Sequence, residues 1–312
     1  MASSKEAELA SAYASCARLA RAHYENFPVA SWMLPRQMRP HIAAIYMFAR
    51  IADDFADEGT VDPEERLQRL EAWRRRLRHS LSGASDGWFQ SNVVDSQSTT
   101  AVSADQKSLF LALANTIQSR RLPVALFEDL LSAFEQDVVV HRYQSWDQLL
   151  DYCSRSANPV GRLVLRVAGH DDPALDRASD CLCTALQLTN FWQDFARDYS
   201  AGRLYLPADD TDAVGADEAD LAVGRLTPAW QEALALVSAR TRDLFLEGRD
   251  VCDGVGGRLS MELRLTWLGG VRILERLERN GFDVFARRPK LGWRDGAVML
   301  WRTMTWAAAK DG

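Results

Sequence analysis

Long apolar runs are missing from this chain of 312 residues. No stretch approaches the ~20 uninterrupted apolar residues that a membrane-spanning helix needs. The most apolar candidate, 297–309, is short and is interrupted by Arg302. Residues 1–10 are polar and lack the apolar core of a signal peptide. We therefore expect a cytoplasmic protein, and a peripheral position at the inner membrane stays open because sequence does not show exposed apolar patches.

An excess of basic residues is also missing. Lys and Arg number 37 against 43 Asp and Glu, which gives a formal net charge of -6. Nucleic-acid binding needs a basic surface, so we expect no nucleic-acid partner. The five cysteines are odd in number and not spaced for zinc, and the five histidines are scattered. These counts indicate free thiols in a reducing compartment.

Nucleotide-binding and nucleophile motifs are absent as well. The chain has no G-x-S-x-G, no G-x-x-x-x-G-K-[ST], and no G-x-G-x-x-G that follows a strand. Apolar residues instead recur at spacings of three and four, and alternation typical of strands is scarce. The pattern predicts an all-α protein, a bundle of roughly eight to twelve helices in a single domain over 1–312.

Several boundaries can be read from helix-capping and loop residues. Asp62 and Pro63 predict a helix start, and the glycines of 254–257 predict a helix break. We expect a flexible N-terminus over about 1–15 and a mobile loop over about 81–106, which is rich in Ser, Asp, Thr and Gly. The acidic stretch 207–220 reads as a connection to a helix that starts near 227.

Two helical segments carry an unusual polar face. In the first, Tyr46, Arg50, Asp53 and Asp57 are four, three and four residues apart, with Asp54 beside them. Side chains at these spacings lie on one face of a helix. The residues between them are largely apolar and predict a buried opposite face.

The second segment repeats the pattern. Gln187, Asn190, Asp194 and Asp198 are three, four and four residues apart, again among apolar residues. Carboxylates at i and i+4 repel each other, so two such faces favour bound cations. Oxygen ligands suit Mg2+, which commonly bridges carboxylates to phosphate oxygens. The alternatives are solvated helix surfaces or a di-iron bundle; the latter needs Glu-x-x-His pairs, and none is present.

Two shorter elements accompany these faces. The segment 202–207 contains Arg203, which could bind phosphate bidentately, although an ordinary surface arginine fits the sequence equally well. The segment 152–161 contains Pro159, which predicts a kink, and the small residues Ser156, Ala157 and Gly161. Those small residues would either leave room for a bulky apolar ligand or let two helices pack closely.

At these residues the chain resembles the squalene/phytoene synthase family of head-to-head prenyl transferases. Residues 53–57 are similar to the family's first aspartate-rich motif, 190–198 to the second, and 202–207 to the segment that follows it. The resemblance extends over about 24–302. It implies an isoprenoid synthase-type helical bundle with a central apolar cavity.

The resemblance also implies roles for single residues. Mg2+, as two or three ions, would be held by Asp53, Asp57, Asn190, Asp194 and Asp198, with Asp54 and Gln187 assisting. Arg50, Arg203 and Tyr205 would contact the diphosphate, and Ala157 and Gly161 would border the substrate. Aromatic rings would stabilise a carbocation, and the candidates are Phe27, Tyr46, Phe48 and Trp192.

Finer details resemble the bacterial hydroxysqualene synthase subgroup. These are the segments 25–31, 156–161 and 190–194, and the pair at 269–270. The subgroup removes diphosphate from presqualene diphosphate and lets water capture the cation. Gln193 stands where many family members have arginine, and Gly270 where many have tyrosine, so we expect both to open space for water. No NADPH is expected.

Two alternative functions remain on sequence grounds. The chain could couple two prenyl diphosphates head-to-head as a presqualene diphosphate, squalene or phytoene synthase. It could also be a catalytically inactive assembly factor of the same fold, although such proteins have eroded aspartate motifs and this chain keeps its aspartates. A transient association with the membrane surface or with neighbouring pathway enzymes stays open.

Overall fold

The computed structural model describes residues 2–22, 33–57, 61–82 and 104–306, and its helices divide into two compact units. One unit comprises Met1–Val139 and Leu163–His170, and the other comprises Val140–Arg162 and Asp171–Gly312. Among the described residues the secondary structure is helical, apart from one isolated bridge between Arg142 and Leu204. The all-α prediction is confirmed, whereas the single domain stays a prediction.

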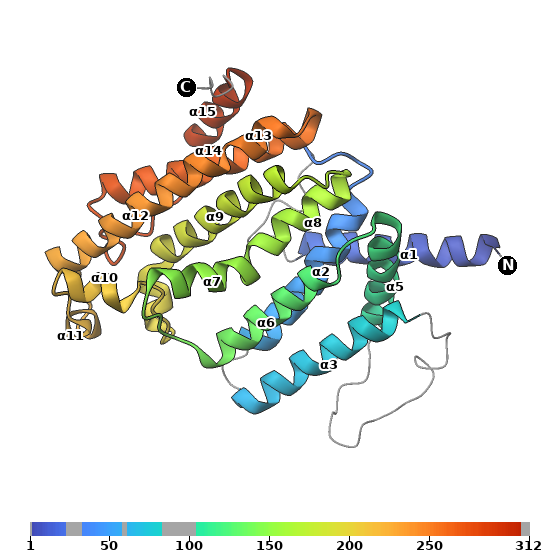
Figure 1. The fold of residues 1–312 in the computed structure, drawn as a ribbon, viewed down its shortest axis with the longest axis horizontal. Helices are drawn as coiled ribbons and strands as arrows, with labels where there is room; N and C mark the ends of the chain where they lie inside the picture. Colours follow the sequence, from blue (N-terminus) through green and yellow to red (C-terminus); the bar gives the residue numbers. More distant parts are fainter. Residues whose placement is uncertain (1, 23–32, 58–60, 83–103, 307–312) are drawn as a thin grey trace. The chain divides into compact units, whose positions relative to one another are not determined.

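The first unit is built around α2 (Figure 1). Its helices are α1 (Ala2–Ala22), α2 (Arg39–Asp57), α3 (Pro63–Leu81), α5 (Ala104–Arg120), α6 (Ala125–Val139) and the second half of α8 (Asn158–Ala168). Helix α2 packs against α1, α3, α5 and α6. Phe48 of α2 lies fully buried among the rings of Trp73, Phe110 and Phe127. This aromatic cluster fixes which face of α2 points outward.

Helix α1 replaces the flexible N-terminus that the sequence suggests for residues 1–15. Ala12, Cys16 and Ala20 form a buried stripe at a spacing of four. The hydroxyl of Tyr13 lies 2.8 Å from the Thr116 hydroxyl and 2.9 Å from the Asn115 side-chain oxygen. The polar first ten residues suggested disorder, but a stripe of small residues is enough to pack a helix.

The second unit is organised around α9, the longest helix in the part of the chain that the structure describes. The unit contains the following helices: α7 (Trp146–Ser156), the first part of α8, α9 (Pro173–Ser200), α10 (Ala208–Ala213), α11 (Glu218–Ala222), α12 (Pro228–Gly248), α13 (Asp250–Gly254), α14 (Gly257–Arg279) and α15 (Trp293–Met304). Helix α9 packs on α7, α12, α13 and α14, and Figure 1 shows α9 beside α12. Trp192 of α9 is fully buried and donates to the Thr241 hydroxyl at 2.9 Å.

Several local predictions are confirmed. Asp62 caps α3 by accepting from the Glu64 amide at 2.8 Å, and α13 ends at Gly254 before α14 begins at Gly257. Helix α12 starts at Pro228. The described residues hold fourteen helices rather than eight to twelve. One reason is that the acidic connection 207–220 contains α10 and part of α11, whose first turn is capped by the Asp217 side chain.

Two predictions fall wholly or mostly outside the described residues. Phe27 and the segment around it lie in 23–32, and most of the predicted loop 81–106 lies in 83–103. Among the described helices, none is both long enough and apolar enough to cross a membrane.

Candidate active site

The first acidic face lies near the C-terminal end of α2, within the first unit. Asp53 and Asp54 are half-buried and Asp57 is exposed. Arg50 forms ion pairs with Asp54 at 2.8 Å and with Asp53 at 3.4 Å. Carboxylates at a helix C-terminus face the negative end of the helix dipole, and α2 has no basic residue in its last turn. The helix end therefore does not offset the negative charge of these carboxylates.

Arg50 keeps one binding group unused. Its Nε is buried and has no hydrogen-bond partner within the described part of the chain. A buried N–H without an acceptor is costly, so such groups often mark a place where a ligand oxygen binds. Tyr46 is half-buried one turn before Arg50. This arrangement suits an anion such as a phosphate next to the acidic face.

The second acidic face lies on α9, within the second unit. Asn190 is exposed, Asp194 is buried and Asp198 is half-buried. The Asn190 side-chain amide donates to Asp194 Oδ2 at 3.1 Å. The opposite face packs into the core through the buried rings of Phe191, Trp192 and Phe195. As on α2, helix packing fixes the direction in which the oxygen ligands point.

Arg288 is the main site residue that sequence reasoning missed. Its Nε donates to Asp194 Oδ1, and its Nη2 donates to Oδ2 at 3.0 Å, which makes a bidentate ion pair. The hydrogen bond to Asp194, together with the charges of Asp194 and Asp198, raises the pKa of Arg288. The basic run 287–290 is visible in the sequence, but no spacing connects it to α9.

Gln193 holds the same segment. Its side-chain amide donates to the Pro289 carbonyl at 2.6 Å. Two adjacent residues of α9 thus bind two adjacent residues of the segment between α14 and α15. The expectation that Gln193 opens space is not matched, because its side chain is engaged in this contact.

The segment 202–207 continues directly from the second acidic face. Gly202 adopts a φ of 84°, a left-handed conformation that favours glycine, and it ends α9 with its amide bonded to the Tyr199 carbonyl at 2.9 Å. The Arg203 amide then donates to the Asp198 carbonyl at 2.8 Å. The turn therefore places Arg203 immediately beyond the acidic stripe of α9.

The ring of Tyr205 packs on α9. It stacks on Phe191 with ring centroids 3.7 Å apart and planes 8° from parallel. The other side of the segment contacts residues 141–143, since the Leu204 amide donates to the His141 carbonyl and Arg142 donates to the Gly202 carbonyl at 2.6 Å. These contacts fix the backbone that carries Arg203.

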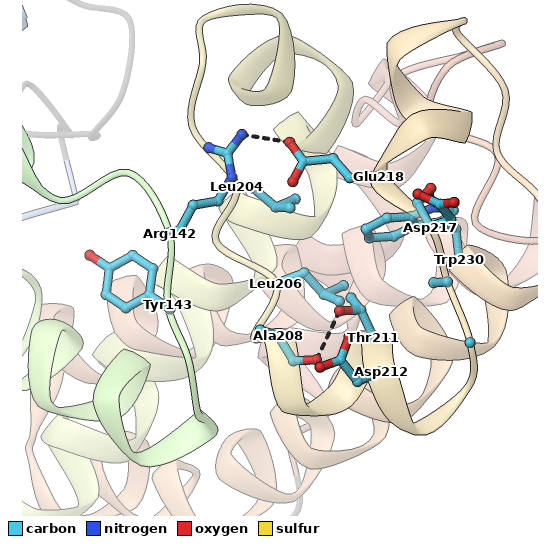
Figure 2. A pocket seen from close by; sticks show the side chains of 12 residues that line it. Arg142, Tyr143, Leu204, Leu206, Ala208, Thr211, Asp212, Asp217, Glu218 and Trp230 are labelled. Carbon is cyan, nitrogen blue, oxygen red and sulfur yellow. Dashed lines mark hydrogen bonds and ion pairs between the residues drawn. The ribbon is translucent and has the colours of Figure 1, made fainter.

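A separate pocket of about 580 Å³ lies beside this segment (Figure 2). Leu204, Leu206 and Trp230 line it, and the Arg142–Glu218 ion pair of 2.6 Å lies at its edge. None of the predicted site residues lines it. It is therefore not the apolar cavity that the sequence suggests, and that cavity stays a prediction.

The comparison with known proteins identifies the family. The family model for squalene/phytoene synthase matches residues 20–295. The chain belongs to this family. Curated relatives include a hydroxysqualene synthase of Rhodopseudomonas palustris, 35% identical over 81% of this chain and 80% of the relative. Another, from Zymomonas mobilis, is 39% identical over 70% of this chain and 67% of the relative.

Solved structures of the family agree with the fold. A crystal structure described as squalene synthase HpnC from Alicyclobacillus acidocaldarius aligns with a TM-score of 0.76 and 38% identity, over 88% of this chain and 96% of that one. A dehydrosqualene synthase aligns with a TM-score of 0.75 at 19% identity, over 97% and 98% of the two chains, which supports the fold alone. Family membership implies prenyl diphosphate substrates.

Close packing explains Gly161 and Gly270, the two glycines that were noted in the resemblance to the family. A Cβ on Gly161 would overlap Ser179 Oγ and lie 2.6 Å from Cys183 Sγ. Gly161 therefore lets α8 approach α9, which favours the packing alternative over ligand room. The helical path is interrupted at Ala157, two residues before Pro159, since α7 ends at Ser156 and α8 begins at Asn158, so the predicted break at Pro159 is present. Ala157 is buried between the two helices.

Gly270 does not open space as the sequence suggests. A Cβ there would lie 2.5 Å from the Phe245 ring and 2.8 Å from Leu186. The room that a larger side chain would occupy is filled by these two neighbours. Phe48 and Trp192 are likewise fully buried in packing cores, so their ring faces are covered by protein atoms. Neither is placed to stabilise a carbocation.

The donor chemistry of the two acidic faces fits Mg2+. The faces offer carboxylate and amide oxygens from Asp53, Asp57, Asn190, Asp194 and Asp198, the ligand types that this ion prefers. Within the described residues no group of three His, Cys, Asp or Glu side chains is close enough to form a metal site alone. Asp194 is neutralised by Arg288 in this structure. The fit is therefore one of ligand type and charge.

Proposed function

We propose that the chain is a hydroxysqualene synthase, which removes diphosphate from presqualene diphosphate and lets water capture the carbocation. The observation that carries the proposal is the buried Asp194 on a face of oxygen ligands that runs directly into Arg203. The support for the substrate comes from curated relatives named hydroxysqualene synthase, at 34–39% identity.

The proposed metal ligands are Asp53 and Asp57 of α2 and Asn190, Asp194 and Asp198 of α9, with Asp54 and Gln187 assisting. When bound, Mg2+ would act as a Lewis acid toward the departing diphosphate. Arg203 and the unused Nε of Arg50 are the proposed donors to the diphosphate oxygens. Tyr205 stays a proposed diphosphate contact, and its stacking on Phe191 keeps the 202–207 segment on α9.

The proposed reaction is balanced without a reductant. The carbon–oxygen bond to diphosphate breaks, and both electrons leave with the diphosphate. A water oxygen forms the new carbon–oxygen bond and releases one proton. Tyr46 and Phe27 are the remaining aromatic candidates for cation stabilisation, and Ala157 stays a candidate substrate contact. NADPH has no part in this scheme.

Product analysis tests the proposal. Purified protein and Mg2+ are incubated with presqualene diphosphate, without NADPH, and the products are separated by gas chromatography and identified by mass spectrometry. We expect hydroxysqualene from presqualene diphosphate and no product from farnesyl diphosphate. If neither substrate is consumed while pyrophosphate and Mg2+ still raise the melting temperature, the proposed activity is wrong and an assembly role gains support.

The second candidate is head-to-head coupling of two prenyl diphosphates. One observation favours it: the solved relative at 38% identity is described as a squalene synthase. Phytoene synthases also match, at 26–30% identity. Presqualene diphosphate formed from farnesyl diphosphate in the same assay would support this candidate and would retain the family's metal-binding faces.

A further inference from the structure

Helix α15 turns an apolar stripe toward solvent. Trp293, Ala297, Leu300 and Met304 are four, three and four residues apart, so they lie on one face, with Trp301 beside them. The exposed fractions are 81% for Trp293, 66% for Trp301 and 77% for Met304. Large apolar side chains gathered on one exposed helix face commonly mark an interaction surface.

The inward face of the same helix carries two buried polar residues, with Met299 between them packed toward Gly269. Asp295 is 3% exposed and accepts from Arg272 Nε at 3.0 Å and from Arg276 Nη2 at 2.6 Å. The Gly292 amide adds a bond at 2.7 Å. Thr303, two turns later, is also buried. The helix is thus held with the Asp295 carboxylate inside and the Trp293 and Trp301 rings outside, whereas an ordinary surface helix exposes its charged residues and buries its large apolar ones.

The far end of α15 is also anchored. The Trp306 indole donates to Asp253 at 2.9 Å, and its ring lies under the guanidinium of Arg249 at 4.4 Å. Because both ends are fixed, a small rotation cannot bury the apolar stripe. The exposure is therefore a property of the fold of the second unit.

The segment that contains α15 and the residues just before it is basic, although the chain as a whole is acidic; we call its exposed basic side chains the rim of the helix. Residues 287–302 contain five basic side chains and one acidic one, a local charge of +4 in a chain of -6. Arg287, Lys290, Arg294 and Arg302 are exposed, and none of them forms an ion pair within the described residues. Exposed tryptophans beside unpaired basic residues are typical of helices that lie in a membrane interface.

Helix α15 extends past the end of the family-model match and is short. The family model ends at residue 295, whereas the stripe continues to Met304. A helix of 12 residues is about 18 Å long, too short to cross a bilayer but long enough to lie along its surface.

We propose that α15 docks the protein on an anionic lipid surface. The stripe of Trp293, Leu300, Trp301 and Met304 would enter the interface, and Arg294 and Arg302 would contact lipid phosphates. A symmetric dimer through the same face would bring two +4 rims together, which disfavours a second copy as the occupant. This proposal concerns location and does not rest on which prenyl diphosphate the enzyme uses.

Vesicle flotation tests the docking. The full-length protein is mixed with vesicles of phosphatidylcholine alone, or with about 30% phosphatidylglycerol added to make the surface anionic. We expect the protein to float with the anionic vesicles, and the floated fraction to fall as salt rises. No flotation with anionic vesicles at low salt would overturn the proposal.

Variants assign the binding to α15. Trp301→Ser with Met304→Ser should lower the apparent vesicle affinity by at least about tenfold, because two apolar side chains are lost from the interface. Arg294→Gln with Arg302→Gln should lower it by about fivefold per arginine. The matched control is Val223→Ser with Leu246→Ser, two exposed apolar residues outside α15, which should float like the original protein.

Two further readouts distinguish lipid docking from misfolding and from self-association. The melting temperature of each variant should stay near that of the original, since the replaced side chains are exposed. Light scattering after size exclusion reports the oligomeric state. If the original protein is a dimer and the Trp301→Ser, Met304→Ser variant is a monomer, the stripe binds a second copy and the proposal is overturned. Turnover of detergent-dispersed substrate should be unchanged in that variant. Flotation therefore succeeds or fails independently of the product assay.

Discussion

Two buried carboxylates in the second unit, Asp194 on α9 and Asp295 on α15, bind arginines in opposite settings. Asp295 accepts from two arginines and one backbone amide. These donors, the Gly292 amide first, hold the pKa of Asp295 well below its usual range. Asp194 meets a single arginine, and the charge of Asp198 also acts on that arginine.

This difference distinguishes Asp295, which forms a structural ion pair, from Asp194, which is a candidate metal ligand. Around Asp295 the charges are matched, because Arg272 and Arg276 bind Asp295 while Glu275 binds Arg272 at 2.6 Å, and the contacts of Asp295 fix the position of α15. Around Asp194 one guanidinium binds the carboxylate, and the charges of Asp194 and Asp198 both act on it. A cation that replaced Arg288 at Asp194 would compete with one guanidinium, whereas at Asp295 it would have to displace two arginines and a backbone amide.

The largest expected effect is on catalysis by Asp194→Ala. We expect turnover to fall by at least about a thousandfold, because the variant removes a proposed metal ligand for the departing diphosphate. Far-ultraviolet circular dichroism should stay unchanged. The assay is product formation at saturating Mg2+. If Asp194→Ala retained a tenth of the activity, Asp194 would not have the catalytic role that distinguishes it from Asp295.

Asp295→Asn should change stability instead. Asparagine keeps the shape but removes the charge that Arg272 and Arg276 bind. We expect a loss of about 1–3 kcal/mol in the free energy of unfolding, less than for a fully buried pair because both arginines are partly exposed. Urea unfolding measures it, with the exposed Asp212→Asn as control. A variant that lost turnover without losing stability would contradict the structural role.

At acid pH the original protein and Asp295→Asn should have similar free energies of unfolding. The folded-state pKa of Asp295 lies below the ordinary value of 3.8, so its contribution is fully present above that value. It is lost as the pH falls from the ordinary value through the folded-state pKa. Urea unfolding at pH values on both sides of 3.8 should show that the difference in free energy of unfolding between the two proteins becomes smaller on the acid side. A larger difference on the acid side would contradict a lowered pKa for Asp295.

Arg288→Gln should sharpen the comparison from the other side. Without the guanidinium, Asp194 is open to a cation, so Mg2+ should bind the substrate-free protein about fivefold more tightly, the equivalent of about 1 kcal/mol for a partly exposed ion pair. Isothermal titration calorimetry measures the affinity. Arg288→Lys should lie between the two proteins. Weaker Mg2+ binding in Arg288→Gln would show that Arg288 supports the metal rather than competing with it.

Local patterns predicted much of this molecule. The spacing of Asp53 and Asp57, and of Asn190 and Asp194, places each set on one helix face because helical pitch alone decides it. The Asp62 cap and the Pro228 start follow from residue chemistry at a helix end. In each case the deciding interactions lie within about one turn of the residue.

Long-range contacts account for what the sequence did not reveal. Arg288 is 94 residues from Asp194, and no spacing rule connects them. Gly270 was expected to open space, but Phe245, on another helix, fills it. The outward stripe of α15 was visible as an apolar run at 297–309, yet its direction depends on Arg272 and Arg276, which lie on α14.

The paired contacts of α9 with Arg288 and Pro289 have a consequence for how ions exchange at Asp194. The Arg288 contact is ionic and competes with other cations, whereas the Gln193–Pro289 hydrogen bond is between neutral groups and does not. When the Arg288 guanidinium leaves Asp194, the neighbouring residue Pro289 therefore stays hydrogen-bonded to Gln193. The guanidinium keeps an effective concentration of about millimolar or above at the site. Arg288 can thus return as soon as the competing cation departs.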